Sequence, residues 1–133
     1  MNIIVGKPPI YDQIVEKIGR PPANAVYTWG RDLYVGKDFV TLDPALAAHE
    51  HTHTLQQEAV GGPEKWWELY LNIPTFRLLQ EVEAYRNQYA MTAEFPRMQR
   101  RAFLRRLARH LSGPMYGNVV SYSGALTALT EKW

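Results

Sequence analysis

The sequence predicts an α+β fold in one domain spanning residues 1–133, with a small sheet near the amino terminus and a mostly helical remainder. Short β-branched and aromatic runs, separated by turn residues, are confined to the part before Asp43. From Asp43 onward, apolar residues recur at helical spacing and are interrupted by proline or glycine. With 133 residues and 46% hydrophobic content, the chain can bury one core, and it shows no repeat or linker.

The amino-terminal third is predicted to be mixed in structure. Ile10, Ile14 and Ile18 recur at helical spacing before Gly19, which predicts a short helix. Four short runs rich in β-branched or aromatic residues predict strands, namely 3–5, 26–29, 33–35 and 39–42. The turn residues 30–32 separate the second and third runs, so these two should form a hairpin, and the fourth should lead into the next helix.

The next helix is predicted to begin at Asp43-Pro44 and to end before residues 61–63, which read Gly-Gly-Pro. Asp can cap free backbone N–H groups, and proline suits the first helical position. Leu46 and Leu55 are expected on the buried side of this helix.

The carboxy-terminal half predicts three further helices, at residues 65–72, 75–91 and 96–112, with breaks at proline or glycine. The second of these carries Leu78, Val82 and Tyr85 at helical spacing, so it is amphipathic. Trp66 and Trp67 in the first have two interpretations, since they could close the small core or line a substrate groove.

Residues 49–53 read His-Glu-His-Thr-His and match the zinc-binding pattern H-E-x-x-H. His49 and His53 are four residues apart, so both imidazoles lie on one face of the predicted helix and can reach one Zn²⁺ ion. Zinc lowers the pKa of a bound water to about 7, and Glu50 beside it can act as general base. His51 should face away from the metal and is assigned no role.

A catalytic zinc usually has three protein ligands, so a third is needed. The remaining histidine, His110, follows an arginine-rich stretch with no matching motif. The amphipathic helix at 75–91 is the better source, because Glu81 lies on its apolar side. Glu83 is rotated about 200° from Glu81 around the helix and should face solvent.

These residues resemble the gluzincin metallopeptidases, in which H-E-x-x-H on one helix is followed by E-x-x-A on the next. The matching residues, as they stand here, are His49, Glu50, His53, Glu81 and Ala84. Tyr85 stands where many members have an aspartate that braces a zinc-binding histidine. The resemblance therefore implies a zincin-like fold and zinc held by two histidines and a glutamate, and it leaves the residues around these ligands open.

The resemblance covers residues 41–90, and the length is similar to that of the single-domain minigluzincins. Gln56 and the run 70–77 give the sequence a further resemblance to small predicted metallopeptidases of bacteria and their phages. In this family a sheet edge pairs with extended peptide substrate, a role for which the hairpin is the candidate. Covering the core is the equally weighted alternative for the hairpin.

The expected function is zinc-dependent hydrolysis of peptide bonds in a peptide or protein substrate, with Glu50 as catalytic base and His49, His53 and Glu81 as metal ligands. Gluzincins usually add a tyrosine or histidine that donates a hydrogen bond to the oxyanion. Tyr116, Tyr122 and His110 are the candidates for this role, and their spacing does not choose among them.

The main alternative is a non-catalytic, zinc-stabilised protein that uses the arginine-rich helix at 97–109 to bind nucleic acid or an acidic partner. Met98, Leu104, Leu107, Ala108 and Leu111 form an apolar stripe opposite six arginines. Because the formal net charge is only +2 and no base-reading motif is present, nucleic-acid binding is not expected, and a locally paired, solvated face is favoured.

The composition limits which covalent links, metal ligands and cellular locations are expected. The chain has no cysteine, which excludes disulfides and thiolate ligands and suits the cytoplasm. It has neither an apolar run long enough to span a membrane nor a signal-peptide pattern. A cytoplasmic location is expected, or a virion-associated one if the chain is phage-encoded, and the oligomeric state stays open.

Overall fold

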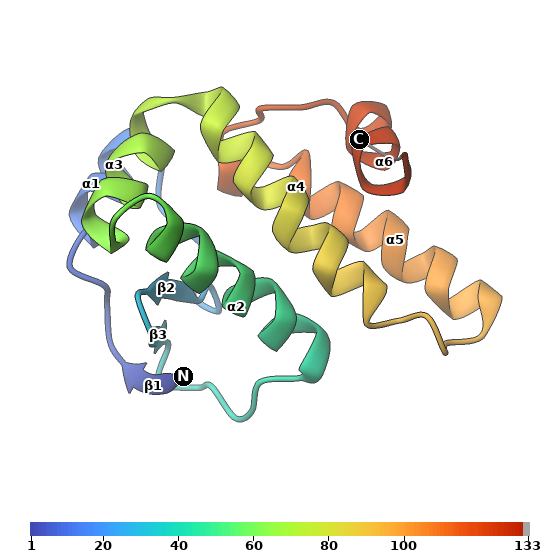
Figure 1. Ribbon diagram of the computed structural model, residues 1–133, viewed down its shortest axis with the longest axis horizontal. Coiled ribbons are helices and arrows are strands. Elements are labelled where there is room, and N and C mark those ends of the chain that lie inside the picture. The colour runs from blue at the N-terminus through green and yellow to red at the C-terminus, as the bar shows by residue number, and fades with distance from the viewer. Residues whose placement is uncertain (132–133) are drawn as a thin grey trace.

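The computed structural model describes residues 1–131 and has an α+β architecture that is mostly helical (Figure 1). A three-stranded mixed sheet consists of β1 (Asn2–Val5), β2 (Tyr27–Trp29) and β3 (Asp32–Val35). The helices in the described part of the chain are α1 (Tyr11–Lys17), α2 (Pro44–Ala59), α3 (Pro63–Asn72), α4 (Pro74–Ala90), α5 (Arg97–Leu111) and α6 (Tyr122–Thr130), with a 3-10 turn, η1 (Pro114–Tyr116).

The sheet has the order β1-β3-β2, so β3 is the central strand. β2 and β3 are antiparallel, with Thr28 opposite Leu33, which confirms the predicted hairpin. β1 pairs with β3 in parallel, and Leu33 and Val35 of β3 are fully buried. The sheet lies beside α2, and β2 is the strand in contact with that helix (Figure 1).

The strand predicted at 39–42 is wrong. The backbone N–H of Phe39 donates to the carbonyl of Gly36 in a turn, and residues 40–43 have no strand assignment. Val40 is 91% exposed, so its apolar side chain packs against nothing that would hold a strand in place. Because β3 is already paired on both sides, residues 39–42 could not pair with the strand that they follow in the chain.

Helix α2 begins as predicted, because one carboxylate oxygen of Asp43 accepts from the backbone N–H groups of both Ala45 and Leu46 at 3.0 Å. Its buried face is different from the expected one. Leu46 is half-buried, but Leu55 is 52% exposed, so the prediction for Leu55 is wrong. The buried residues of α2 are all polar, namely His49, Glu50, Thr52, His53, Thr54, Gln56 and Gln57.

Helix α4 runs beside α2 and also contacts α3, α5 and α6, so it is the central helix of the molecule (Figure 1). The core consists mainly of residues from α3, α4, α5 and α6, including Trp66, Trp67, Val82, Tyr85, Leu107, Leu111 and Leu129. None of the helices within residues 1–131 is both long enough and apolar enough to cross a membrane.

The predicted apolar stripe of α5 is only partly correct. Leu107, Ala108 and Leu111 are buried, and Leu104 is half-buried, whereas Met98 is 76% exposed. The first turns of α5 project past the other helices with the end of α4, so the stripe meets the core only in its second half (Figure 1). Helix α6 was not predicted; it begins where the hydroxyl of Ser121 accepts from the backbone N–H of Gly124 at 3.0 Å.

Candidate metal centre

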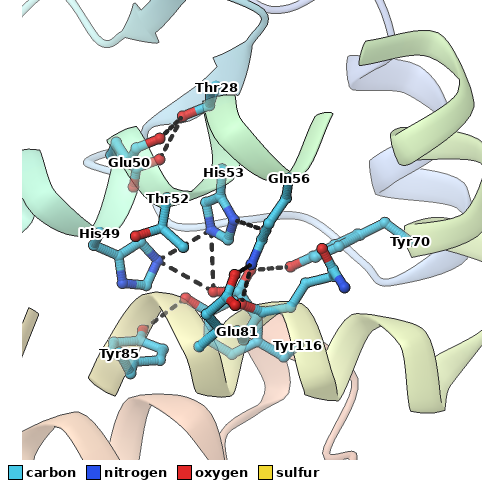
Figure 2. Close-up of polar contacts among 12 residues, drawn as sticks. Thr28, His49, Glu50, Thr52, His53, Gln56, Tyr70, Glu81, Tyr85 and Tyr116 are labelled. Atoms are coloured by element: carbon cyan, nitrogen blue, oxygen red, sulfur yellow. Dashed lines mark hydrogen bonds and ion pairs between the residues drawn. The ribbon is translucent and has the colours of Figure 1, made fainter. Parts of the chain in front are cut away.

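The polar face of α2 is the unusual feature of this fold. A buried polar group without a partner costs about 1–3 kcal/mol, so a helix that buries seven polar residues needs partners for them. Outside the helix itself, these partners come from α4 and from the hairpin of β2 and β3 (Figure 2). The resulting network brings together two histidines of α2 and one glutamate of α4.

His49, His53 and Glu81 converge on one point, as the sequence predicts (Figure 2). The Nε2 atoms of His49 and His53 are 3.2 Å apart, and they lie 3.2 and 3.4 Å from the Oε1 atom of Glu81. All three residues are at most 5% exposed. The group could therefore hold a metal ion, with two nitrogen donors and one oxygen donor.

Two glutamines orient the imidazoles. The amide oxygen of Gln88 lies 2.9 Å from Nδ1 of His49, and that of Gln56 lies 2.8 Å from Nδ1 of His53. Since an amide oxygen can only accept, each Nδ1 carries the hydrogen and each Nε2 is left to act as a metal ligand. The amide nitrogen of Gln56 donates to the Gln80 carbonyl and to the Glu83 carboxylate, which fixes the direction of this amide.

Glu81 itself has one satisfied and one unsatisfied oxygen. Oε2 accepts a hydrogen bond from the hydroxyl of Tyr70 at 2.7 Å. Oε1 is fully buried and has no hydrogen-bond partner within residues 1–131. A buried carboxylate oxygen that accepts no hydrogen bond and faces two imidazole nitrogens fits the donor set of two histidines and a glutamate that binds catalytic zinc. Glu83 is exposed, as predicted, and contributes no donor to this point.

Glu50 lies beside the three converging residues. All four residues line one cleft. It is 5% exposed, and its Oε2 atom accepts from the hydroxyl of Thr28 on β2 at 2.7 Å (Figure 2). This hydrogen bond connects β2 to Glu50, the residue that the H-E-x-x-H pattern predicts to be the general base. His51 is exposed, in agreement with its predicted orientation away from the site.

Among the three candidates for an oxyanion donor, Tyr116 is the one nearest to Glu81 and the histidines. Its hydroxyl lies 2.6 Å from that of Tyr85, and both side chains line the cleft (Figure 2). Burial, followed by the charge of Glu81, raises the pKa of both phenols, so both remain protonated and able to donate. Tyr122 is outside the cleft lining, and His110 lines it from the end of α5.

Several partners in this site have no signal in the sequence. Thr28, Tyr70 and Gln88 each bond to a site residue through a contact between different elements. Tyr85 stands where the resemblance implies an aspartate that braces a histidine. Its ring instead packs edge-on against that of His49, with the two ring centroids 4.4 Å apart. Gln88, nearly one turn further along α4, braces His49 in its place.

The hairpin anchors α2. The carbonyl of Thr28 accepts from the side chains of Gln57 and Trp67, and that of Gly30 accepts from the hydroxyl of Thr54. The backbone N–H of Gly30 donates to the amide oxygen of Gln57 at 2.6 Å. These backbone groups of the hairpin are thus engaged within the protein and are not free to pair with a peptide at that stretch.

The cleft has a volume of about 1060 Å³ and its lining includes the metal-centre residues and Glu50. Its other walls are the loop from Ile18 to Thr28, the end of α5 and the segment from Gly113 to Tyr116. Trp66 and Trp67 are buried in the core and also line this cleft, so the two interpretations of these residues are compatible. No protein-family model, curated protein or solved structure matches the chain.

The protonation of the centre predicts a pH dependence of metal binding. Burial disfavours the imidazolium of His53, but the Glu81 carboxylate, together with Glu50 and the hydrogen bond to Gln56, outweighs burial and raises the pKa of His53 to about 9. Burial likewise opposes ionisation of Glu81, yet His53 and His49 hold its pKa well below the usual range. Without metal at pH 7, His53 therefore carries a proton and Glu81 does not.

Because a metal-binding imidazole must be neutral, zinc binding at pH 7 should release about one proton from this pair. The apparent affinity should rise with pH and level off as pH passes the His53 pKa of about 9. Calorimetric titrations in buffers of different ionisation enthalpy measure the proton release directly. Binding at pH 7 with no proton release would contradict the assignment of His53 as a ligand.

Replacing Gln88 with alanine should weaken zinc binding about 10–100-fold, the usual effect of losing a hydrogen-bond partner of a metal-binding histidine. The adjacent Asn87 provides a control, since it donates to Thr52 and does not touch His49. Competition with a fluorescent chelator compares the two variants. Equal zinc affinities for Gln88→Ala and Asn87→Ala would show that Gln88 does not support the metal centre.

Proposed function

We propose that this protein is a zinc-dependent metallopeptidase, with one zincin-like domain of gluzincin type spanning residues 1–133. The observation that carries the proposal is the convergence of two imidazole nitrogens on the buried Oε1 of Glu81, which has no hydrogen-bond partner among the described residues, with Glu50 in the same cleft. A purely structural metal site would have no use for a buried carboxylate at the position of Glu50. His49, His53 and Glu81 would hold the zinc ion.

Bound zinc would supply Lewis acidity, which lowers the pKa of water and polarises a peptide carbonyl. Glu50 takes a proton from the attacking water and passes it to the leaving amine as the carbon–nitrogen bond breaks. The hydroxyl of Thr28 holds the Glu50 carboxylate in one orientation. Tyr116 and Tyr85, both protonated, are the hydrogen-bond donors available to a developing oxyanion in the cleft.

Digestion of a diverse peptide mixture tests this function. Zinc-loaded protein should generate new peptide termini, which mass spectrometry identifies together with the residues flanking the cut bond. A chelator added before the peptides serves as the control and should suppress these termini. Failure to cleave any peptide in a broad mixture would favour a binding protein over a peptidase.

A zinc-stabilised binding protein is the second candidate, and the arginines of α5 favour it. The predicted local pairing of these arginines is wrong, because none of the six lies within 4.0 Å of a carboxylate of residues 1–131. Two of them stack on aromatic rings instead, Arg100 over Tyr89 and Arg106 over Phe103. The helix thus presents uncompensated positive charge that a polyanion could neutralise.

We expect only weak association with a polyanion, because few phosphates are neutralised and no base-reading group accompanies the arginines. A fluorescently labelled single-stranded oligonucleotide should bind in a salt-sensitive, sequence-independent way. Arg101→Glu with Arg105→Glu should abolish this binding and leave the zinc content unchanged. Tight binding that persists at physiological salt would contradict this expectation and support a nucleic-acid-directed role.

A further inference from the structure

The carboxylates that line the cleft are already engaged within the protein. Three acidic residues contribute to the lining, namely Asp43, Glu50 and Glu81. Asp43 caps helix α2, Glu50 accepts from Thr28, and Glu81 is surrounded by Tyr70 and the two histidines. None of these acids is directed at an arginine within ion-pair distance.

Three arginines line the same cleft without a carboxylate partner. Arg106 and Arg109 lie on the last turns of α5, and Arg20 lies on the loop that follows α1. All three are exposed, and none is within 4.0 Å of a carboxylate in the part of the chain that the structure describes. The guanidinium of Arg106 lies 4.9 Å from the ring centre of Phe103, which supports its side chain from behind.

The spacing along α5 separates the arginines into two groups. Residues 106, 107, 109 and 110 of α5 line the cleft, and this spacing places them on one side of the helix. Arg97, Arg101 and Arg105 are exposed and do not contribute to the lining. The helix therefore directs two of its guanidinium groups toward the cleft and three toward solvent elsewhere.

His110 gives a second indication of positive charge at this wall of the cleft. Partial burial lowers its pKa, and the neighbouring charges of Arg106 and Arg109 lower it further. The imidazole is therefore neutral at pH 7 and does not add to the charge of the arginines. The local potential that suppresses a cation on His110 is one that attracts an anion.

We infer that Arg106 and Arg109, with Arg20 on the facing loop, form a carboxylate-binding subsite, so that the cleft selects peptides carrying an acidic group. This inference rests on the proposed peptidase function. A guanidinium matches a carboxylate through paired N–H donors, and it keeps its charge at any working pH. The carboxylate can belong to an aspartate or glutamate side chain or to the carboxyl terminus of the peptide.

Peptide binding to zinc-loaded Glu50→Gln protein tests the subsite without turnover. The probes are peptides of one length with an uncharged fluorophore, carrying glutamate or glutamine at successive positions, each made with a free or an amidated carboxyl terminus. The side-chain and terminal substitutions distinguish the two sources of carboxylate. Each exposed charge pair contributes a factor of up to about five, so a preferred acidic peptide should bind about tenfold more tightly than its neutral counterpart.

The control uses the two groups of arginines on the same helix. Arg106→Glu with Arg109→Glu should remove the preference for the acidic peptide, whereas Arg101→Glu with Arg105→Glu should retain it. Both double variants make the same change in net charge, so a general electrostatic effect would alter them equally. Equal loss in both, or no acidic preference in the parent protein, would overturn the subsite. Zinc content and melting temperature establish that each variant is folded.

Cleavage by protein that retains Glu50 separates this inference from the proposed function. Cleavage of neutral and acidic peptides at equal rates would overturn the subsite and support the peptidase. Tight, Arg106- and Arg109-dependent binding of acidic peptides without any cleavage would support the subsite and count against the peptidase. Faster cleavage of acidic peptides, lost in the Arg106→Glu and Arg109→Glu variant, is the result expected when both hold.

Discussion

Replacing Glu50 with glutamine is expected to lower peptide hydrolysis about 10²–10⁴-fold, the usual effect of losing a general base. The amide has the size of the carboxylate but cannot accept the proton from water. Zinc content should stay the same, because Glu50 is not among the three converging donors. Initial rates on a cleaved peptide, with zinc measured in the same samples, provide the comparison.

Glu58 supplies the matched control, since it lies on the same helix but is exposed, and its carboxylate lies 3.8 Å from the guanidinium of Arg31. Glu58→Gln should leave both zinc content and hydrolysis unchanged, as surface ion pairs of this kind contribute little. Hydrolysis that survives unaltered in Glu50→Gln would remove Glu50 from the mechanism. Loss of zinc in Glu50→Gln would instead place this residue among the ligands.

Replacing Glu81 with glutamine should have the largest effect on the metal. It removes the only negative charge among the three donors, so the loss of zinc affinity should exceed the factor of about 10–100 seen for hydrogen-bond partners of ligands. Glu83→Gln is the control on the same helix. The carboxylate of Glu83 accepts from Gln56, which in turn contacts His53, so the effect of Glu83→Gln should stay at or below about tenfold.

Zinc retained after dialysis against a graded series of chelators ranks the two variants. The assignment of Glu81 predicts that Glu81→Gln loses zinc at a chelator strength that Glu83→Gln and the parent protein tolerate. The opposite ranking would make Glu83 the ligand and would require α4 to turn about its axis. Equal retention in all three proteins would remove the carboxylate from the centre altogether.

Local chemistry explains which parts of this structure could be predicted from the sequence. Asp43 and Pro44 determine where α2 starts, and an i, i+4 histidine pair must share one face of any helix. Glu81 could be distinguished from Glu83 because the apolar residues of α4 define its buried side. These inferences needed only residues within one or two turns of each other.

The remaining features depend on contacts between distant segments. Thr28 and Glu50 are 22 residues apart, and His49 and Gln88 are 39 apart, so no local pattern joins them. Leu55 was expected inside because leucine is apolar, but α2 turns its polar face inward to build the centre. The apolar pattern thus failed where the helix carries the candidate site, because the buried positions of α2 are occupied by polar side chains.

Stoichiometric reactivation tests the central claim most directly. Protein stripped of metal by a chelator and returned to metal-free buffer is titrated with zinc, and cleavage of one peptide substrate is followed at each addition. We predict no cleavage in the stripped protein and a rise that saturates at about one zinc per chain. Cleavage that needs no zinc, or zinc binding at His49, His53 and Glu81 that never produces cleavage, would contradict the proposal that this centre is a peptidase active site.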